Sequence, residues 1–322
     1  MADKSGLFRG TFPALITPMQ EDGNRINHAI NYGAMGDLVH FVLDNGCEGV
    51  VVAGCTAHSA GFRDAQEQLE SIKFVKNAVD SYNKEKNTRK IVIAGDGMPS
   101  TYNTLELAKR VEGEAGVFNH LMISPSTNKP SQDGLLKHYS AVADGINGNG
   151  RIIMYSVPGR TGGQGILTET AVSLAYHPNI AGIKEASGDE KRIRDTIEGT
   201  RGLDFAVLSG DDSLNMQIIG YGGSGTISVA ANVDPQRTSA SVRLALNGME
   251  DNARRINAEL ESLYKALFLS PSGSPSMAHY ALRQSGFSVG VPRLPLTDAA
   301  PENAREMDRV LSNLGLVGLL QH

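Results

Sequence analysis

The sequence predicts an α/β fold, a (β/α)8 TIM barrel followed by a C-terminal helical appendage. Three observations support this fold class. Short strand-like runs end in Gly, Pro, Ser, Thr or Asp, stretches with helical apolar spacing separate them, and the alternation repeats about eight times. Such alternation indicates right-handed βαβ crossovers, and eight units are the number that closes the barrel. An open doubly wound sheet is the alternative.

The predicted strands follow one another at intervals that leave room for a helix between each pair. They are Thr11–Thr17, Gly49–Ala53, Ile91–Ala94, His120–Ile123, Arg151–Val157, Ile180–Ile183, Phe205–Ser209 and Thr226–Ala230. The intervening segments carry apolar residues at helical spacing. These predicted helices are Ile30–Asp44, Asp64–Tyr82, Thr104–Glu114, Gly134–Asp144, Thr168–Ala175, Lys191–Thr200 and Asp212–Tyr221.

The chain continues well beyond the eighth predicted strand. Pro235–Leu269 has the pattern of one long helical region, and a Pro- and Gly-containing breaker follows at Ser270–Pro275. Two more helical segments, Ser276–Ser285 and Pro301–Leu314, complete the chain. These segments follow the eight strand–helix units that form the barrel. We therefore expect a barrel catalytic domain over residues 1–235 and a helical region over residues 236–322.

Composition narrows the class of partner. The 322 residues are 40% hydrophobic and 20% charged, with a net charge of −5 and no long basic run. This argues against nucleic acid and anionic membranes as partners. The N-terminus lacks an apolar signal segment, and no stretch approaches the roughly 20 apolar residues that span a bilayer. We therefore expect a cytoplasmic protein that acts on small molecules.

The cysteines and histidines indicate neither a disulfide nor a metal site. Cys47 and Cys55 are the only cysteines, and a bridge would require the predicted strand between them to fold back on itself. The histidines show no H-x-x-x-H spacing and the cysteines no C-x-x-C spacing. We expect reduced thiols and no structural metal.

Lys184 is the first candidate catalytic residue. It closes a short apolar run, Ile180–Ile183, and a lysine in that place points into the barrel or lies at its mouth. Burial disfavours the charged amine, and a neutral amine can attack a carbonyl to form a Schiff base. The alternative is a lysine whose stem is packed while its head remains in water.

Tyr155 closes the preceding strand, so its side chain can meet that of Lys184. Because side chains alternate along a strand, Gly182 lies on the same face as Lys184, where it leaves room for substrate or side-chain packing. A phenol there can shuttle the protons that imine formation requires. A core tyrosine with a satisfied hydroxyl is the alternative.

Two further features suit a carboxylate. Arg160 follows the fifth strand in a segment rich in Pro and Gly, and its guanidinium can clamp a substrate carboxylate bidentately. A surface arginine is the alternative. The turn Gly54–Ser59, which contains Cys55 and Thr56, offers backbone N–H groups and hydroxyls to a carboxylate such as that of pyruvate.

With these residues assembled, the chain resembles the dihydrodipicolinate synthase and N-acetylneuraminate lyase family of class I, pyruvate-dependent aldolases. The resemblance covers almost the whole chain, and the C-terminal Arg293–Leu296 belongs to it. The other matching stretches are Gly10–Pro18, Gly54–Thr56, Ile93–Gly95, Asn128–Gly134, Tyr155–Gly162, Gly182–Gly188, Ser209–Asp212 and Gly225–Val233.

The resemblance implies a barrel with a helical tail, usually a homotetramer built as a dimer of dimers, without metal or organic cofactor. It implies that Lys184 forms the imine, that Tyr155 is the catalytic phenol and that the Thr56 hydroxyl links it to the proton relay. Arg160 resembles the clamp that the synthase branch uses for aspartate semialdehyde, and the lyase branch lacks an arginine there. Two more positions, Gly210 and Ile227, correspond to residues that line the pyruvate site.

The chain departs from the family pattern at two places. Where the family has Gly-Thr-Thr-Gly-Glu, this chain has Gly-Cys-Thr-Ala-His at Gly54–His58, and where the synthase has Pro-Tyr-Tyr-Asn it has Pro125–Asn128. In the family the second of those tyrosines crosses the dimer interface to complete the relay, and Thr127 takes its place here. The first is replaced by Ser126, which argues against feedback inhibition by lysine.

The leading hypothesis is condensation of pyruvate with aspartate 4-semialdehyde to 4-hydroxy-tetrahydrodipicolinate, in lysine and diaminopimelate synthesis. A class I retro-aldolase that cleaves a 2-keto-3-deoxy or 4-hydroxy-2-oxo acid to release pyruvate is the first alternative. A barrel that binds a keto acid without catalysis is the second. The sequence leaves the second substrate open among these.

Overall fold

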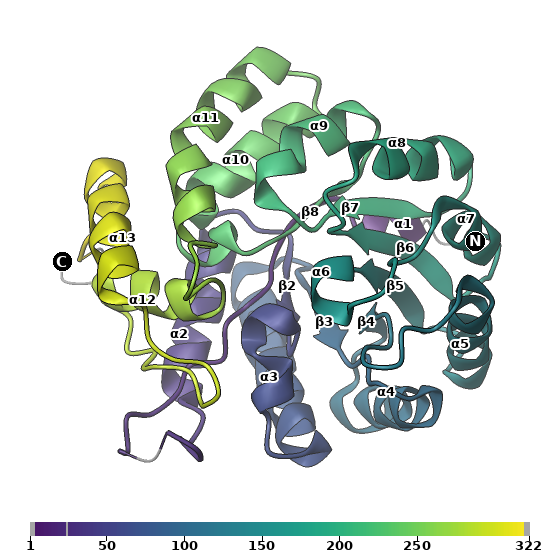
Figure 1. Cartoon of the computed structure of the whole chain (residues 1–322), viewed down its shortest axis with the longest axis horizontal. Coiled ribbons are helices and arrows are strands. Elements are labelled where there is room, and N and C mark those ends of the chain that lie inside the picture. The colour runs from purple at the N-terminus through teal and green to yellow at the C-terminus, as the bar shows by residue number, and fades with distance from the viewer. Residues whose placement is uncertain (1–3, 24, 319–322) are drawn as a thin grey trace. The chain divides into compact units, whose positions relative to one another are not determined.

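The computed structural model describes residues 4–23 and 25–318 (Figure 1). Its strands are β1 (Gly10–Pro13), β2 (Gly49–Val52), β3 (Ile91–Gly95), β4 (Asn119–Ile123), β5 (Arg151–Ser156), β6 (Ile180–Glu185), β7 (Ala206–Ser209) and β8 (Gly225–Ser228). They form one eight-stranded sheet in the order β1-β8-β7-β6-β5-β4-β3-β2. A parallel bridge between Ala14, just after β1, and Val51 of β2 connects the two ends of that order. This topology confirms the predicted (β/α)8 barrel with C-terminal helices.

Helices alternate with the strands. Those between strands are α2 (Tyr32–Asp44), α3 (Ala65–Lys86), α4 (Thr101–Ala115), α5 (Gln132–Gly145), α6 (Pro158–Thr161), α7 (Thr168–Ala175), α8 (Glu190–Gly199) and α9 (Asn215–Gly220). Side chains of Asp64, Ser100 and Ser131 accept hydrogen bonds from backbone N–H groups in the first turns of α3, α4 and α5. These caps satisfy donors that the helix itself leaves unpaired, so the starts of these helices follow from local sequence.

The C-terminal region differs from the sequence-based expectation. In place of one helical region over Pro235–Leu269, the chain forms α10 (Pro235–Leu246) and α11 (Glu250–Ala266). Gly248 between them has φ +78°, a left-handed conformation that glycine adopts without steric cost. This tight turn ends the first helix although the apolar spacing continues. The remaining helices, α12 (Ser276–Gln284) and α13 (Pro301–Leu314), lie within the predicted segments.

Three other predicted elements are shorter than expected, and the first is the strand Thr11–Thr17, which ends at Pro13. The segment Asp212–Tyr221 begins as a 3-10 turn at Asp212–Leu214, and only α9 is α-helical. The eighth strand ends at Ser228, because Ala230–Asn232 forms a second 3-10 turn. Both turns lie within three residues of the carboxyl end of a strand and are closed by local bonds, from the Leu214 N–H to the Asp211 carbonyl at 3.0 Å and from the Asn232 N–H to the Val229 carbonyl at 3.1 Å.

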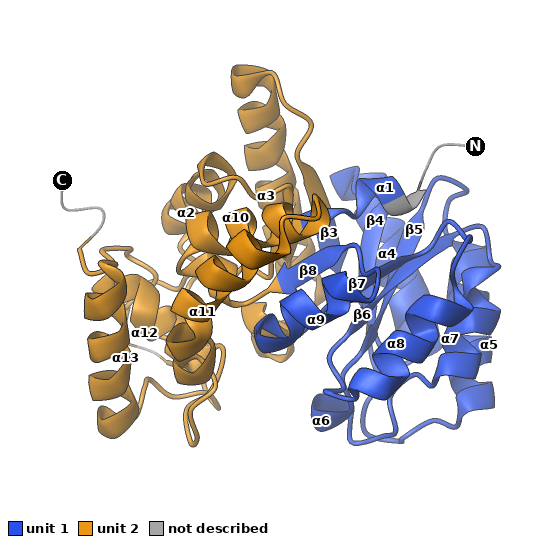
Figure 2. Ribbon diagram, turned by 90° about the horizontal axis from the view of Figure 1, so that it is seen from above, with its two compact units in different colours: residues 1–10, 93–227 blue, residues 11–92, 228–322 orange. Residues whose placement is uncertain are grey.

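The chain divides into two compact units (Figure 2). Unit 1 comprises residues 1–10 and 93–227, and unit 2 comprises residues 11–92 and 228–322. In unit 1, α5, α7 and α8 cover β4 to β6, and buried side chains such as Met122, Met154 and Ile183 form the core. In unit 2, α10 packs on α11, and α12 packs on α13.

Unit 1 contains a buried charged cluster that the sequence did not predict. His120 of β4 places Nδ1 2.6 Å from Oδ2 of Asp96, which follows β3, and Nε2 3.3 Å from Oε1 of Glu112 in α4. Glu112 Oε2 also accepts a hydrogen bond from the Asn147 backbone N–H. Burial alone would lower the pKa of His120, but the two carboxylates outweigh it and raise that pKa to about 9.

This cluster predicts that the protein loses stability as the pH rises above neutrality. The pKa of His120 is about 9 in the folded state and about 6.5 in the unfolded chain, so protonation of His120 stabilises the fold. This contribution is fully present below about pH 6.5 and is lost as the pH rises to about 9. The shift corresponds to about 3 kcal/mol at most. Urea unfolding across this range should show a falling free energy for the wild type. His120→Gln, although less stable at low pH, should show a flatter profile, and parallel profiles for the two proteins would contradict the prediction.

Candidate active site

Lys184 and Tyr155 face each other across two neighbouring strands. The register of β5 and β6 pairs Tyr155 with Lys184 and Ile153 with Gly182. The Lys184 amine Nζ lies 4.3 Å from the centroid of the Tyr155 ring. Both residues are buried, with Lys184 only 3% exposed. The structure thus confirms the predicted adjacency and excludes the alternative of a lysine head in open water.

Two glycines make this arrangement possible by close approach. A Cβ added to Gly210, after β7, would lie 2.9 Å from Lys184 Cε and 2.8 Å from Ala186 Cβ. A Cβ added to Gly182 would lie 2.4 Å from the backbone oxygen of Ala206 in β7. Gly182 therefore leaves room for the neighbouring strand β7. The expectation that it leaves room for substrate is wrong. Gly210 leaves room for the lysine side chain itself.

Glu185 ends β6 directly after the lysine and is a buried acid whose role the sequence did not suggest. It is 1% exposed, and its Oε1 accepts a hydrogen bond of 2.8 Å from the Ser187 backbone N–H. Burial raises the pKa of Glu185 to about 7, while the bonds from Ser187 act in the opposite direction. Because side chains alternate along a strand, this carboxyl points to the opposite face from Lys184.

Arg160 lies in α6, in the loop that follows β5. Pro158 begins this helical turn, and Gly162 ends it in a left-handed conformation with φ +68°. The Thr161 hydroxyl donates to the Val157 carbonyl at 3.2 Å and closes the turn. The Arg160 side chain is exposed, so it is accessible to a ligand that arrives from solvent.

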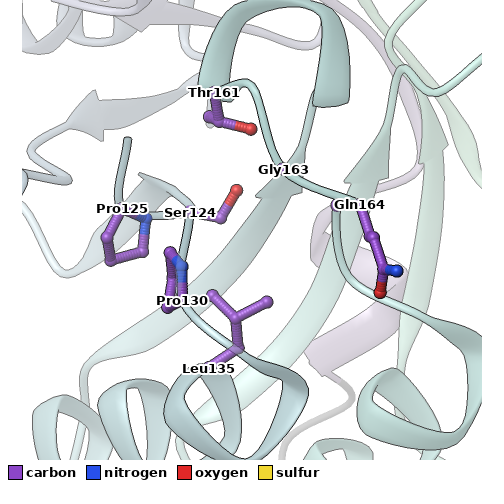
Figure 3. A pocket seen from close by; sticks show the side chains of 8 residues that line it. Ser124, Pro125, Pro130, Leu135, Thr161, Gly163 and Gln164 are labelled. Atoms are coloured by element: carbon purple, nitrogen blue, oxygen red, sulfur yellow. The ribbon is translucent and has the colours of Figure 1, made fainter. Parts of the chain in front are cut away.

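A small recess lies beside these loops but does not include Lys184, Tyr155 or Arg160 (Figure 3). It encloses about 200 Å³, including open solvent at its mouth. Its lining residues come from the segment after β4 and the first turn of α5, and from the end of α6 and the segment after it. They are Ser124, Pro125, Pro130, Leu135, Thr161, Gly163, Gln164 and Gly165. The recess lies between these two segments of the chain. We do not identify it with the predicted pyruvate site.

The segment after β4 carries backbone strain at the position where the sequence departs from the family pattern. Thr127 has φ +73°, a conformation that is rare for a β-branched residue. The Asn128 backbone N–H donates to the Ser126 carbonyl at 2.8 Å and tightens the turn. The Thr127 side chain is exposed. The strained turn therefore presents a short hydroxyl side chain to the surface of this chain.

The remaining candidate residues are Cys55, Thr56 and Ile227. Cys55 and Thr56 belong to unit 2 and lie in a 3-10 turn, Cys55–Ala57, that follows β2. Thr56 is buried and Cys55 half-buried, and both cysteines of the chain are free thiols. Ile227 is fully buried in β8 of unit 1, the unit that also holds Lys184, Tyr155, Arg160 and Gly210.

Within residues 4–23 and 25–318, no group of three or more His, Cys, Asp or Glu side chains is arranged to hold a metal ion. No helix in the same part of the chain is long and apolar enough to cross a membrane.

Comparison with known proteins agrees with this architecture. The model of the dihydrodipicolinate synthetase family matches residues 7–314. The 4-hydroxy-tetrahydrodipicolinate synthase of Haloarcula marismortui is 39% identical over 307 residues, which are 95% of this chain and 94% of that protein.

Solved structures give the same result. The dihydrodipicolinate synthase of Aquifex aeolicus superposes with a TM-score of 0.86 at 34% identity, covering 96% of this chain and 99% of that one. The enzyme of Acinetobacter baumannii, solved in complex with pyruvate, gives 0.87 at 32% identity, covering 96% of this chain and 100% of that one. A match over nearly the whole length, with the barrel topology and the paired Tyr155 and Lys184, means that this chain belongs to the dihydrodipicolinate synthetase family.

Proposed function

We propose that the protein is a 4-hydroxy-tetrahydrodipicolinate synthase, which condenses pyruvate with aspartate 4-semialdehyde through an imine on Lys184. The observation that carries the proposal is the buried Lys184 amine, 4.3 Å from the centre of the Tyr155 ring at paired strand ends. Burial disfavours the charged form of an amine, and the neutral form is the nucleophile that attacks a carbonyl. The relatives of this chain are 4-hydroxy-tetrahydrodipicolinate synthases, and their activity supplies the identity of the product.

The chemistry assigns each residue a step. The neutral Nζ of Lys184 attacks the keto carbon of pyruvate, and loss of water from the carbinolamine forms the imine. Loss of a methyl proton then gives an enamine, whose carbon attacks the aldehyde carbon while the aldehyde oxygen takes up a proton and becomes a hydroxyl. Attack of the semialdehyde's amino group on the imine carbon closes the ring and releases the Lys184 amine. Tyr155 moves the protons in these steps, and the Thr56 hydroxyl connects it to the relay. Cys55, Thr56, Gly210 and Ile227 line the pyruvate site, and the space that Gly210 leaves around Lys184 Cε supports its part in this.

Arg160 binds the carboxylate of the semialdehyde in this proposal, and Arg160→Ala tests it. A hydrogen-bonded charge pair of this kind raises kcat/KM about 10- to 100-fold, so kcat/KM for the semialdehyde should fall by that factor when the guanidinium is removed. Formation of the pyruvate imine, measured by borohydride trapping, should be nearly unchanged. Arg201→Ala, which removes an exposed arginine paired with Glu198 at the end of α8, is the control and should affect neither measurement. Equal loss of imine formation in Arg160→Ala would show that Arg160 supports the pyruvate site or the fold.

A retro-aldolase that releases pyruvate is the second candidate, and Thr127 is the observation that favours it. The exposed threonine is too short to replace a phenol in a relay. Turnover of 4-hydroxy-2-oxo acids that equals or exceeds condensation, and that does not depend on Arg160, would support this candidate over the synthase.

The proposal extends to assembly and location. We infer a cytoplasmic homotetramer arranged as a dimer of dimers, as the family resemblance implies. We also retain residues 1–235 as the catalytic barrel and residues 236–322 as a helical region that supports it.

A further inference from the structure

Arg293, between α12 and α13, is a buried arginine whose donors are all engaged. It is 1% exposed. Nε donates to the His28 carbonyl at 2.9 Å, and Nη2 donates to the same oxygen. Nη1 donates to the Gly61 carbonyl at 3.0 Å and to Glu67 Oε2 at 2.6 Å, and Nη2 reaches Glu67 Oε1 at 2.8 Å. Because an unpaired buried guanidinium is very costly, this complete set of partners fixes Arg293 in one geometry.

Glu67 is the second member of this group. Besides the two bonds from Arg293, it accepts hydrogen bonds from Arg63, from the backbone N–H at 2.8 Å and from Nε at 2.7 Å. Burial works to raise the pKa of Glu67, but the bonds from Arg293 and Arg63 outweigh it and lower that pKa. Glu67 lies in the first turn of α3, and its backbone N–H is capped by Asp64. The carboxylate therefore ties Arg293 to the start of this helix.

The Gly61 carbonyl connects Arg293 to the turn that contains Thr56. This turn consists of two 3-10 segments, Cys55–Ala57 and Ser59–Gly61, with His58 between them at φ +55°. Gly61 N–H donates to the His58 carbonyl at 2.7 Å, and a Cβ on Gly61 would lie 2.5 Å from the His58 ring. The turn is thus compact, and a displacement at Gly61 is transmitted to His58.

Long-range hydrogen bonds hold the turn at two carbonyls, one on each side of His58. The Thr17 hydroxyl donates to the Ala57 carbonyl at 3.0 Å, and Arg293 donates to the Gly61 carbonyl. Thr56 immediately precedes Ala57, whose carbonyl is the first of these two attachment points. All of these residues belong to unit 2. The position of the Thr56 hydroxyl therefore depends on both attachments.

We propose that Arg293 is a positioning residue for catalysis, which holds the Thr56 turn in place through the Gly61 carbonyl and Glu67. The inference rests on the role of Thr56 under the proposed function. It assigns to the C-terminal region a part in the reaction, although this region contributes no reacting group. A displacement of about 1 Å at a catalytic group can cost about 100-fold in rate, so a small relaxation of the turn is sufficient for a large effect.

Arg293→Lys tests this inference, since a lysine keeps the charge but cannot reproduce the planar fork. We expect kcat for the condensation to fall about 10- to 100-fold, with KM for the semialdehyde nearly unchanged. Hydrogen–deuterium exchange of the peptide 54–62 should become faster. Arg283→Lys is the matched control, because Arg283 also donates to a carbonyl, that of Gly290 at 2.8 Å, and to a carboxylate, that of Asp298 at 2.6 Å. It should lower the melting temperature without changing kcat or exchange in this peptide.

A double-mutant cycle with Thr56→Val separates positioning from general destabilisation. If Arg293 acts through Thr56, Arg293→Lys should cost little more in a Thr56→Val background, so that the two losses are far from multiplicative. Glu67→Gln provides a second variant should Arg293→Lys fold poorly, and it should show a smaller loss with the same non-additivity.

Three results would overturn the inference: multiplicative losses, unchanged exchange in 54–62, or a loss of kcat in Arg283→Lys equal to that in Arg293→Lys. A Thr56→Val variant with wild-type kcat would instead refute the role of Thr56 in the proposed function. In that case exchange in 54–62 still reports whether Arg293 holds the turn.

Discussion

Lys184→Arg will leave the protein unable to form a borohydride-trapped adduct with pyruvate, and condensation will fall by several orders of magnitude. The substitution keeps a long, positively charged side chain in the space beside Gly210. A guanidinium stays protonated at all accessible pH values and cannot attack a carbonyl. Peptide mass spectrometry after treatment with pyruvate and borohydride should find the reduced adduct on Lys184 of the wild type and on no residue of the variant.

Lys191→Arg is the control for this experiment, because Lys191 of α8 is a surface lysine whose side chain is 76% exposed and paired with Asp195. It should leave both the adduct and turnover unchanged. A wild-type adduct on a lysine other than Lys184, or a labelled Lys184→Arg variant, would refute the imine mechanism proposed for this site. The keto-acid-binding barrel without catalysis would then be the better hypothesis.

Tyr155→Phe should have the second largest effect. It retains the ring that packs beside the Lys184 amine and removes only the hydroxyl, so imine formation and condensation lose a proton shuttle. General acid–base catalysis of this kind contributes about 10²–10⁴-fold, and kcat should fall by a factor in that range. Steady-state kinetics with pyruvate and aspartate semialdehyde measure the loss, and the melting temperature shows whether the fold is intact.

Tyr264→Phe is the matched control. Tyr264 of α11 is also buried, and its hydroxyl donates to Asn257 Oδ1 at 3.0 Å in unit 2. Removing that hydroxyl should cost about 1 kcal/mol of stability and leave kcat unchanged. A similar loss of kcat in both variants would mean that Tyr155 supports packing, and a wild-type kcat in Tyr155→Phe would remove it from the proton relay.

The fold and the centre of the candidate site could be predicted from local patterns. Alternating strand and helix signals are repeated along the chain, and they determine the barrel because parallel strands need crossover helices. The same reasoning placed Tyr155 beside Lys184, since neighbouring strand ends must lie close together. Their catalytic roles, and those of Thr56, Arg160, Cys55, Gly210 and Ile227, stay predictions that the experiments above test.

Other features depended on contacts that local spacing does not encode. The break at Gly248 interrupts an apolar pattern that continues on both sides, so the sequence alone suggested one helix. The buried cluster of Asp96, Glu112 and His120 brings together a strand end, a helix and the next strand, and each of these residues taken singly looks like an ordinary polar side chain.

By itself, the sequence determined the barrel, the strand that carries Lys184 and the residue that faces it, because strand periodicity and βα order act over short distances along the chain. Only the tertiary structure decided how the turn with Thr56 is held. Arg293 reaches Glu67 across 226 residues and the His28 carbonyl across 265. Such bonds form only after the chain has folded, and their strength comes from burial that removes competing water.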